Sequence, residues 1–220
     1  RMSEPKTAVD RATDDEIVAM IQACRSARDR LVVLLLSRVG LRRGEAAGLR
    51  RSDVHFLPDN RVHGCAIAGA HLHVVRRPNA NGAWAKSRHP RAVPVDFMVV
   101  RSLDLYLLER EEQPAAAGCD YLLVNLFRAP LGAPMQPGAF NELFESLSRR
   151  AGLTRTVTPH QGRHAFGSNL ADSGALLDEI QMLMGHASPT SAQPHLHPSA
   201  DRLRAAVEQV GSPRATVDPT

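Results

Sequence analysis

The sequence predicts a mainly α-helical domain with a small antiparallel β-sheet near the middle of the chain. Helical periodicity of apolar residues occupies both halves, and two short runs rich in β-branched residues lie between them, joined through an Asn-Gly turn signal. With 220 residues, of which 43% are hydrophobic, two full domains would be cramped. We expect one domain over residues 13–210, between a polar N-terminal segment at 1–12 and a flexible tail at 211–220.

The first helices are predicted from local start and stop signals. Thr13 opens a capping box ahead of an apolar stretch, so the first helix begins there. The apolar run at 31–36 predicts a buried helix that leads into Gly40, and residues 43–49 predict a short helix after it.

The middle of the chain favours strands. Residues 71–77 and 91–95 are rich in β-branched side chains, and Pro-Asn-Ala-Asn-Gly at 78–82 supplies a turn between them, which predicts a hairpin. Helical periodicity returns at 97–111 and occupies most of the chain from Gly138 onward.

Composition excludes several classes of protein. No run approaches the roughly 18 apolar residues of a membrane span, and the amino terminus lacks a signal pattern. The three cysteines, Cys24, Cys65 and Cys119, are odd in number and far apart, which suggests neither a disulfide framework nor a CxxC metal site. We therefore expect a cytoplasmic protein with no membrane partner.

Basic residues gather in two parts of the sequence. No acidic residue lies between Asp59 and Asp96, and a second basic cluster is opposed locally only by Glu45 and Asp53. The first group contains Arg61, Arg76, Arg77, Lys86, Arg88 and Arg91, and the second contains Arg38, Arg42, Arg43, Arg50 and Arg51. Such groups fit either the solvated faces of an arginine-rich protein or a surface that binds a polyanion.

His160 and Arg163 lie three residues apart where a helix is predicted to begin, so they share one helix face. Arginine offers a planar fork for paired oxygens, and histidine can exchange a proton near neutral pH, which together suit a phosphate. The same spacing also fits a surface or capping role.

Lys86 is one of only two lysines among 27 basic residues, the other being Lys6. Arginine cannot release its proton in a working pH range, whereas an ammonium in a phosphate-rich site can act as a general acid. Lys86 is therefore a candidate general acid, unless the lysine persists by chance.

Four motifs follow one another in order: GLRRGE at 40–45, KSRHPRAVP at 86–94, HQGR at 160–163 and GHAS at 185–188. This ordered set resembles the tyrosine recombinases of the phage-integrase family over nearly the whole chain. The resemblance implies the tyrosine-recombinase catalytic-domain fold, double-stranded DNA as partner, and strand cleavage and rejoining through a 3′-phosphoenzyme intermediate.

The resemblance also assigns roles. Arg42 and Arg163 would grip the non-bridging oxygens of the scissile phosphate, and Lys86 would protonate the departing 5′-oxygen. His160 would assist proton movement at the nucleophile, and His186 would hydrogen-bond the phosphate.

Further expectations follow from the same family. Glu45 would orient the arginines, and no metal ion or other cofactor is expected, because side chains supply the cations. The residues expected to contact DNA are Arg43, Arg76, Arg77, Arg88 and Arg91. The helix at 201–210 would pack on its own domain or, as in the family, dock on a neighbouring protomer in a homotetramer assembled on DNA.

The nucleophile position departs from the family. Counting nine residues past the histidine of GHAS arrives at His195, where the family has tyrosine. Tyr106 and Tyr121 look like core or boundary residues far from the motif. Pro194 would disturb a helix there, and Gly162 replaces the usual large apolar residue.

Three interpretations of His195 stay open. In the first, the chain is an inactive or engineered nucleophile mutant that still binds DNA, because imidazole differs in reach and would leave a labile phosphoramidate. In the second, the histidine is a nucleophile in an otherwise working site. In the third, the pocket of His160, His186, His195 and His197 is repurposed, a metal site included. We therefore expect an impaired site-specific recombinase, either a fragment or a lone catalytic domain. The alternative is a catalytically inactive DNA-binding regulator or accessory protein.

Overall fold

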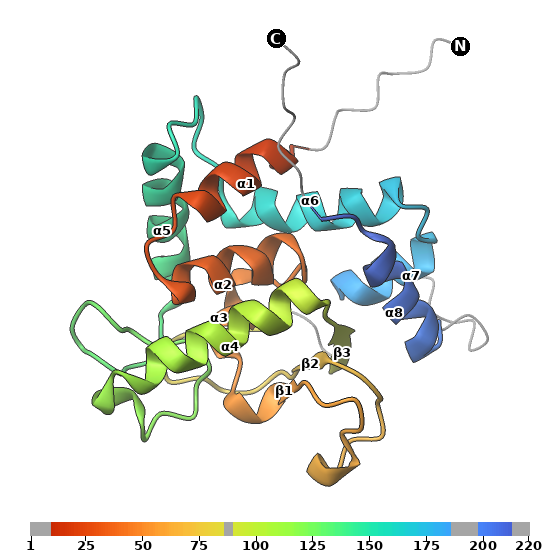
Figure 1. The fold of residues 1–220 in the computed structure, drawn as a ribbon, viewed down its shortest axis with the longest axis horizontal. Helices are drawn as coiled ribbons and strands as arrows, with labels where there is room; N and C mark the ends of the chain where they lie inside the picture. Colours follow the sequence, from red (N-terminus) through yellow and green to blue (C-terminus); the bar gives the residue numbers. More distant parts are fainter. Residues whose placement is uncertain (1–9, 86–89, 186–197, 213–220) are drawn as a thin grey trace.

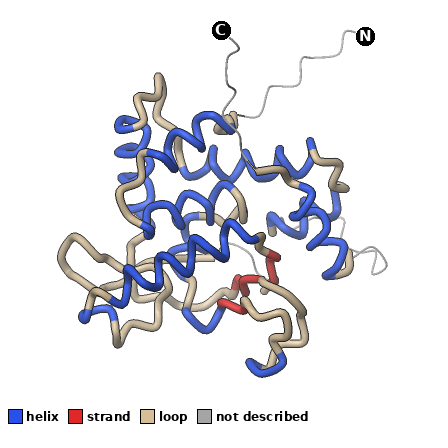
Figure 2. The backbone as a smooth tube through the Cα atoms, in the orientation of Figure 1, coloured by secondary structure: helices blue, strands red, loops and turns tan. Residues whose placement is uncertain are grey.

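The computed structural model describes residues 10–85, 90–185 and 198–212, and it is mainly helical, with a small sheet at one edge (Figures 1 and 2). The α-helices are α1 Asp14–Gln22, α2 Ala27–Ser37, α3 Arg43–Gly48, α4 Phe97–Glu111, α5 Pro137–Arg150, α6 Pro159–Asp172, α7 Leu177–Met184 and α8 Ala200–Gln209. The strands are β1 Val54–His55, β2 His71–Val74 and β3 Arg91–Pro94, and short 3₁₀ turns are η1 Arg51–Asp53, η2 Arg61–His63 and η3 Pro114–Ala116.

Helix α2 forms the centre of the fold, where it packs against α4 and α6 (Figure 1). Every residue from Leu31 to Leu36 is at most 3% exposed, which confirms the predicted buried helix. A helix that is apolar on all sides has to be covered on all sides, and α1, α5 and α3 contact it as well.

The sheet has the order β1-β2-β3, and both pairings are antiparallel. The register sets His71 opposite Pro94 and Val74 opposite Arg91, which confirms the predicted hairpin. Strand β1 adds only two residues, with His55 opposite His71, and was not predicted from the sequence.

Local signals fix the helix starts that matter for the site. Thr13 accepts a hydrogen bond from the backbone N–H of Glu16 and completes the predicted capping box of α1. Thr158 caps α6 in the same way, with Pro159 in the first turn, and thereby places His160 and Arg163 in the first two turns of the helix.

The chain ends were predicted as a polar segment and a flexible tail. Of the first segment the structure describes 10–12, where Asp10 accepts hydrogen bonds from Arg155 and Gln161, and Ala12 is 1% exposed. Only 211–212 of the tail are described. Among the helices that the structure describes, none combines the length and the apolar character that crossing a bilayer requires.

Helix α8 packs on its own domain, one of the two arrangements that the sequence left open. Leu203, Ala206 and Val207 are buried, and the helix contacts α6, α7 and β3. Arg204 on the same helix donates hydrogen bonds to the carbonyls of Ala68 and Ala70, in the loop before β2.

Gly162 is buried in α6, at the position where the resemblance predicted a large apolar residue. A Cβ atom at this position would lie 3.4 Å from the Phe144 ring and 3.8 Å from Leu36 Cβ, which is ordinary contact. We expect Gly162→Ala to raise the free energy of unfolding by about 0.5–1 kcal/mol, because alanine loses less backbone entropy in a helix. Urea denaturation measures the change.

The control for this prediction is Gly162→Leu. Its larger side chain would collide with Phe144 and should lower stability by about 1–3 kcal/mol. A loss of stability in the alanine variant would contradict the prediction and would mean that the Phe144 ring cannot move enough to accommodate a methyl group.

Candidate functional site

A buried carboxylate, Glu45, lies at the centre of a group of three arginines. The Glu45 side chain is fully buried, and its two oxygens accept hydrogen bonds from Arg91 Nη1 and Nη2 at 3.0 and 2.9 Å. Arg42 donates from Nη1 to Glu45 Oε1 at 3.0 Å, and Arg163 Nη1 lies 3.9 Å from Oε2. One carboxylate thus orients guanidinium groups from three separate elements.

The backbone around the site is shaped to hold these groups. Glu45 reaches back from the first turn of α3 to the backbone N–H of Arg42. Gly40 has a φ of +69°, and a Cβ there would overlap the Phe166 ring, so glycine is required at this turn. Arg163 Nη1 donates to the Gly40 carbonyl and Nη2 to the Met184 carbonyl, which joins α6 to the end of α7.

A surface cavity of about 480 Å³ opens over this group. It is lined by Arg42, Arg43 and Gly44 from α3 and its start, by Gly82 and Trp84, by Pro137 and Asn141 from α5, and by Thr158, Pro159, His160 and Arg163 from α6 and its cap. The structure therefore brings Arg42, His160 and Arg163 to one cavity.

The cavity is electropositive. Burial, together with the charge of Arg42, lowers the pKa of Arg163 to about 9 against the opposing effect of Glu45, so its guanidinium stays protonated at pH 7. Burial alone would raise the pKa of Glu45, but the hydrogen bonds and charges of Arg91 and Arg42 together outweigh it and hold this pKa below its usual value. Among the described residues, Glu45 is the only carboxylate within ion-pair distance of Arg42, Arg91 or Arg163.

His160 is exposed at the cavity and lies beside a second histidine. Its Nε2 is 2.7 Å from Nε2 of His164, so the two rings share one proton in a hydrogen bond. Burial, the neighbouring His160 and Arg163 lower the pKa of His164. Sequence analysis had not assigned His164 a role, although its i, i+4 spacing from His160 places both on one helix face.

The residues predicted to contact DNA fall into two groups. Arg43 and Arg76 are exposed, and Arg76 lies 4.4 Å over the ring of the exposed Trp84. Arg77 instead donates two hydrogen bonds of 2.8 Å to Asp53. Arg91 is 8% exposed in its side chain because it is paired with Glu45, so it supports the cavity from below rather than facing solvent.

Several predicted site residues lie outside the described residues: Lys86, Arg88, His186 and His195, with His197 of the alternative histidine pocket. Gly185, which precedes His186, is described, and its carbonyl accepts a hydrogen bond from Arg42 at 3.2 Å. A Cβ at Gly185 would lie 2.6 Å from the Arg91 guanidinium, so the GHAS motif begins in contact with the arginine group.

Neither tyrosine of the chain offers a free hydroxyl at the cavity. Tyr106 is fully buried and donates to the Leu122 carbonyl, and burial raises its pKa to about 12. Tyr121 is 5% exposed and accepts a hydrogen bond from the backbone of Ala80.

Solved structures share this fold. A crystal structure of XerA recombinase superposes with a TM-score of 0.66 at 26% identity and covers 94% of this chain and 66% of that one. The lambda integrase catalytic core has a TM-score of 0.56 at 19% identity, with coverages of 80% and 91%. XerH recombinase bound to its difH substrate has a TM-score of 0.60 at 23% identity, with coverages of 81% and 47%. The fold is that of the tyrosine-recombinase catalytic domain.

Sequence comparison then gives the family. The profile of the Phage integrase family matches residues 10–202, and the chain belongs to this family. The tyrosine recombinase XerA of Pyrococcus horikoshii is 27% identical over 205 residues, which are 93% of this chain and 62% of that protein. The chain thus spans less than two thirds of the length of this curated relative.

Proposed function

We propose that this domain binds duplex DNA as a site-specific recombinase does, with the scissile phosphate in the cavity between α3 and α6. The observation that carries the proposal is the convergence of Arg42 and Arg163 on that cavity. Among the described residues, a single carboxylate, that of Glu45, pairs with these two arginines and with Arg91. An unbalanced, partly buried group of guanidinium ions has a strong preference for an anion with several oxygens.

In this proposal the arginines act on the phosphate directly. Arg42 and Arg163 donate hydrogen bonds to its non-bridging oxygens and offset the charge that builds up in the pentacoordinate transition state. Glu45 and Arg91 hold the guanidinium groups in place before the substrate arrives, so little reorganisation is needed. Lys86 would protonate the departing 5′-oxygen, and His186 would hydrogen-bond the phosphate.

The chemistry needs a nucleophile that attacks phosphorus as the bond to the 5′-oxygen breaks. In a tyrosine recombinase the phenol oxygen forms the new bond, and its proton passes to a base, for which the His160 and His164 pair is the candidate. With His195 at that position we propose that cleavage through a 3′-phosphoenzyme link is impaired.

Covalent capture tests this function. The protein and its His195→Tyr variant are each incubated with a nicked suicide duplex library, and a protein–DNA band that resists denaturation is sought. We expect a band only with tyrosine. A band with the unaltered protein would identify a histidine nucleophile and overturn the proposed impairment.

A second candidate function is a DNA-binding regulator on the recombinase fold. The burial of both Tyr106 and Tyr121 favours it, because neither can replace the missing nucleophile. This candidate predicts duplex binding without a covalent band from either protein.

DNA binding itself makes a separate prediction. The exposed guanidinium of Arg76 lies over the ring of Trp84, which lines the cavity. We therefore expect Arg76→Ala to weaken duplex binding and to reduce the magnitude of the salt slope, d log K/d log[salt], by about 1. Fluorescence anisotropy across salt concentrations measures both. Arg61→Ala is the control, because Arg61 is also exposed but is paired with Asp59. Equal effects of the two substitutions would contradict the proposed DNA face.

The homotetramer on DNA is also part of the proposal. Cross-linking with and without a duplex that carries two binding sites tests it, since a DNA-assembled tetramer forms only with the duplex. If single protomers occupy the two sites and no tetramer is cross-linked, the proposed assembly is wrong, but the proposed phosphate site is unaffected.

A further inference from the structure

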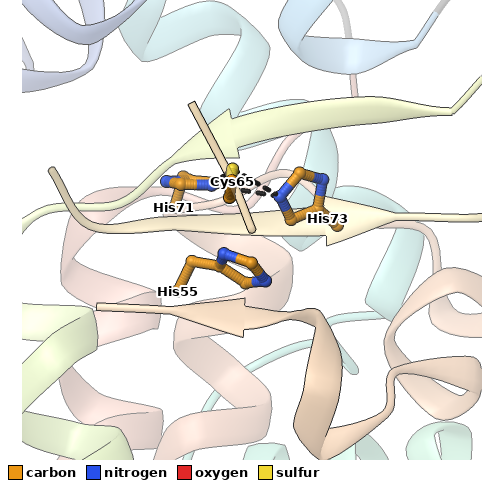
Figure 3. A group of neighbouring side chains, drawn as sticks. All are labelled: His55, Cys65, His71 and His73. Carbon is orange, nitrogen blue, oxygen red and sulfur yellow. Dashed lines mark hydrogen bonds between the residues drawn. The ribbon is translucent and has the colours of Figure 1, made fainter. Parts of the chain in front are cut away.

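Three histidines and a cysteine lie together at the sheet, away from the residues that line the cavity. His71 and His73 share one face of β2, His55 ends the neighbouring strand β1, and Cys65 lies in the loop between the two strands. Figure 3 shows the sulfur of Cys65 between the rings of His71 and His73, with His55 on the adjacent strand. One nitrogen or sulfur atom from each residue lies within 4.8 Å of all the others.

The spacing of three of these atoms, those of Cys65, His71 and His73, is close to that of a tetrahedral metal site. With bonds of about 2.3 Å to sulfur and about 2.05 Å to nitrogen, a tetrahedral zinc ion separates S and N ligands by about 3.6 Å and two N ligands by about 3.3 Å. Cys65 Sγ lies 3.4 Å from Nε2 of both His71 and His73, and those two nitrogens lie 3.1 Å apart. For these three atoms a shift of a few tenths of an ångström would admit the ion, whereas the ligand atom of His55, which lies within 4.8 Å of the others, would have to move closer to them.

Backbone carbonyls fix the orientation of two of the rings. Nδ1 of His71 lies 2.8 Å from the Gly69 carbonyl, which can only accept, so Nδ1 carries the proton and Nε2 presents its lone pair to the cluster. Nε2 of His55 lies 3.2 Å from the Ser52 carbonyl and donates in the same way. Metal-bound histidines commonly have such a second partner.

One buried nitrogen of the cluster, Nδ1 of His55, supports the presence of a cation. With Nε2 of His55 donating to Ser52, its Nδ1 keeps a lone pair, and this atom is buried with no hydrogen-bond partner among the residues that the structure describes. An unsatisfied buried acceptor costs about 1–3 kcal/mol, so hydrogen bonds within the cluster alone leave it unexplained. A cation at the centre of the four residues would satisfy it.

We propose that His55, Cys65, His71 and His73 bind one zinc ion. Nitrogen and thiolate ligands suit zinc, and four protein ligands leave no open position, which is the pattern of a structural rather than a catalytic site. The ion would join the loop after β1 to strand β2. Since the carbonyls of Ala68 and Ala70 at the end of that loop accept hydrogen bonds from Arg204, the site also supports the packing of α8.

Metal analysis of the untagged full chain tests the proposal. After incubation with ZnCl₂ and removal of free metal, we expect inductively coupled plasma mass spectrometry to find one zinc per chain. Cys65→Ser should lower zinc affinity by at least about 100-fold, more than the effect of a lost second partner. Cys24→Ser is the matched control, because Cys24 is also a partly buried free cysteine. Its thiol donates a hydrogen bond to the Met20 carbonyl.

Cobalt gives a second readout on the unaltered chain, so this measurement does not depend on whether the Cys65→Ser variant folds. Co²⁺ bound to the unaltered chain should show the intense visible bands of a tetrahedral site and a thiolate-to-cobalt charge-transfer band, both unchanged in Cys24→Ser. Less than a tenth of a zinc per chain, or weak bands of octahedral cobalt without charge transfer, would overturn the proposal. Equal zinc binding by Cys65→Ser and the unaltered chain would overturn it too.

Discussion

Replacing Arg163 with lysine in the His195→Tyr protein is expected to slow covalent capture of a nicked duplex by about 100- to 1,000-fold, the usual cost of one lost transition-state donor. Arg163 lines the cavity with a nearly buried guanidinium, so the donor acts where water screens little. Lysine keeps the charge but loses the planar fork that can meet two phosphate oxygens. Single-turnover capture rates measure the effect.

A structural role of Arg163 has to be separated from this effect, because the same side chain donates to the carbonyls of Gly40 and Met184. A thermal melt of each variant tests whether the domain remains folded. Arg155→Lys is the matched control, since Arg155 pairs with Glu16 and Asp10 on the surface and lies outside the cavity lining. A folded Arg163→Lys protein with an unchanged capture rate would exclude Arg163 from the proposed phosphate site.

The helices were predictable because their signals are local. The capping box at Thr13 and the apolar run at 31–36 gave α1 and the core of α2, and α4 occupies the predicted 97–111. Each signal lies within the helix or at its end, so no distant contact is needed to interpret it.

Strand β1 could not be predicted for the opposite reason. Two residues carry no period, and Val54 and His55 become a strand only by pairing with Leu72 and His71. The same pairing brings His55 to the cluster with Cys65, whose partners are histidines rather than a second cysteine of a CxxC motif. The spacing of Cys65 from His71 and His73 was visible in the sequence, but the ligand from β1 depends on register.

The candidate site divides in a similar way. The motifs identified Arg42, Glu45, His160 and Arg163, and the fold brings these residues together at and beneath one cavity. The spatial role of a charge is not visible in sequence, because a positive residue near DNA and one that neutralises a buried carboxylate look alike. Arg91 was expected to contact DNA, yet in the fold its guanidinium lies on Glu45.

Glu45→Gln is expected to lower the free energy of unfolding at pH 7 by about 3–5 kcal/mol, because removing one partner leaves buried guanidinium groups without a countercharge. Glutamine keeps the shape and one carbonyl acceptor, so the loss reports charge rather than packing. The side chains of Arg91 and Arg163 are 8% and 5% exposed, and water therefore cannot replace the carboxylate. Urea denaturation of both proteins at several pH values measures the difference.

The pH dependence follows from the lowered pKa of Glu45. Because the folded-state pKa lies below the usual 4.5, the charge of Glu45 contributes fully at pH values above about 5 and is lost as the pH falls through the lowered pKa. The stability difference between the two proteins should therefore be constant from pH 5 to pH 7 and shrink in acid, where protonated glutamate resembles glutamine.

Glu142→Gln controls for a general effect of removing one negative charge. Its side chain is 73% exposed and lies 3.9 Å from Arg128, so the change in stability should stay within about 0.5 kcal/mol at every pH. A Glu45→Gln loss below about 1 kcal/mol at pH 7, or one that persists undiminished into acid, would mean that the arginine group does not depend on this carboxylate. Its guanidinium ions would then need another anion in the folded protein, and the preorganisation proposed for the phosphate site would have a different origin.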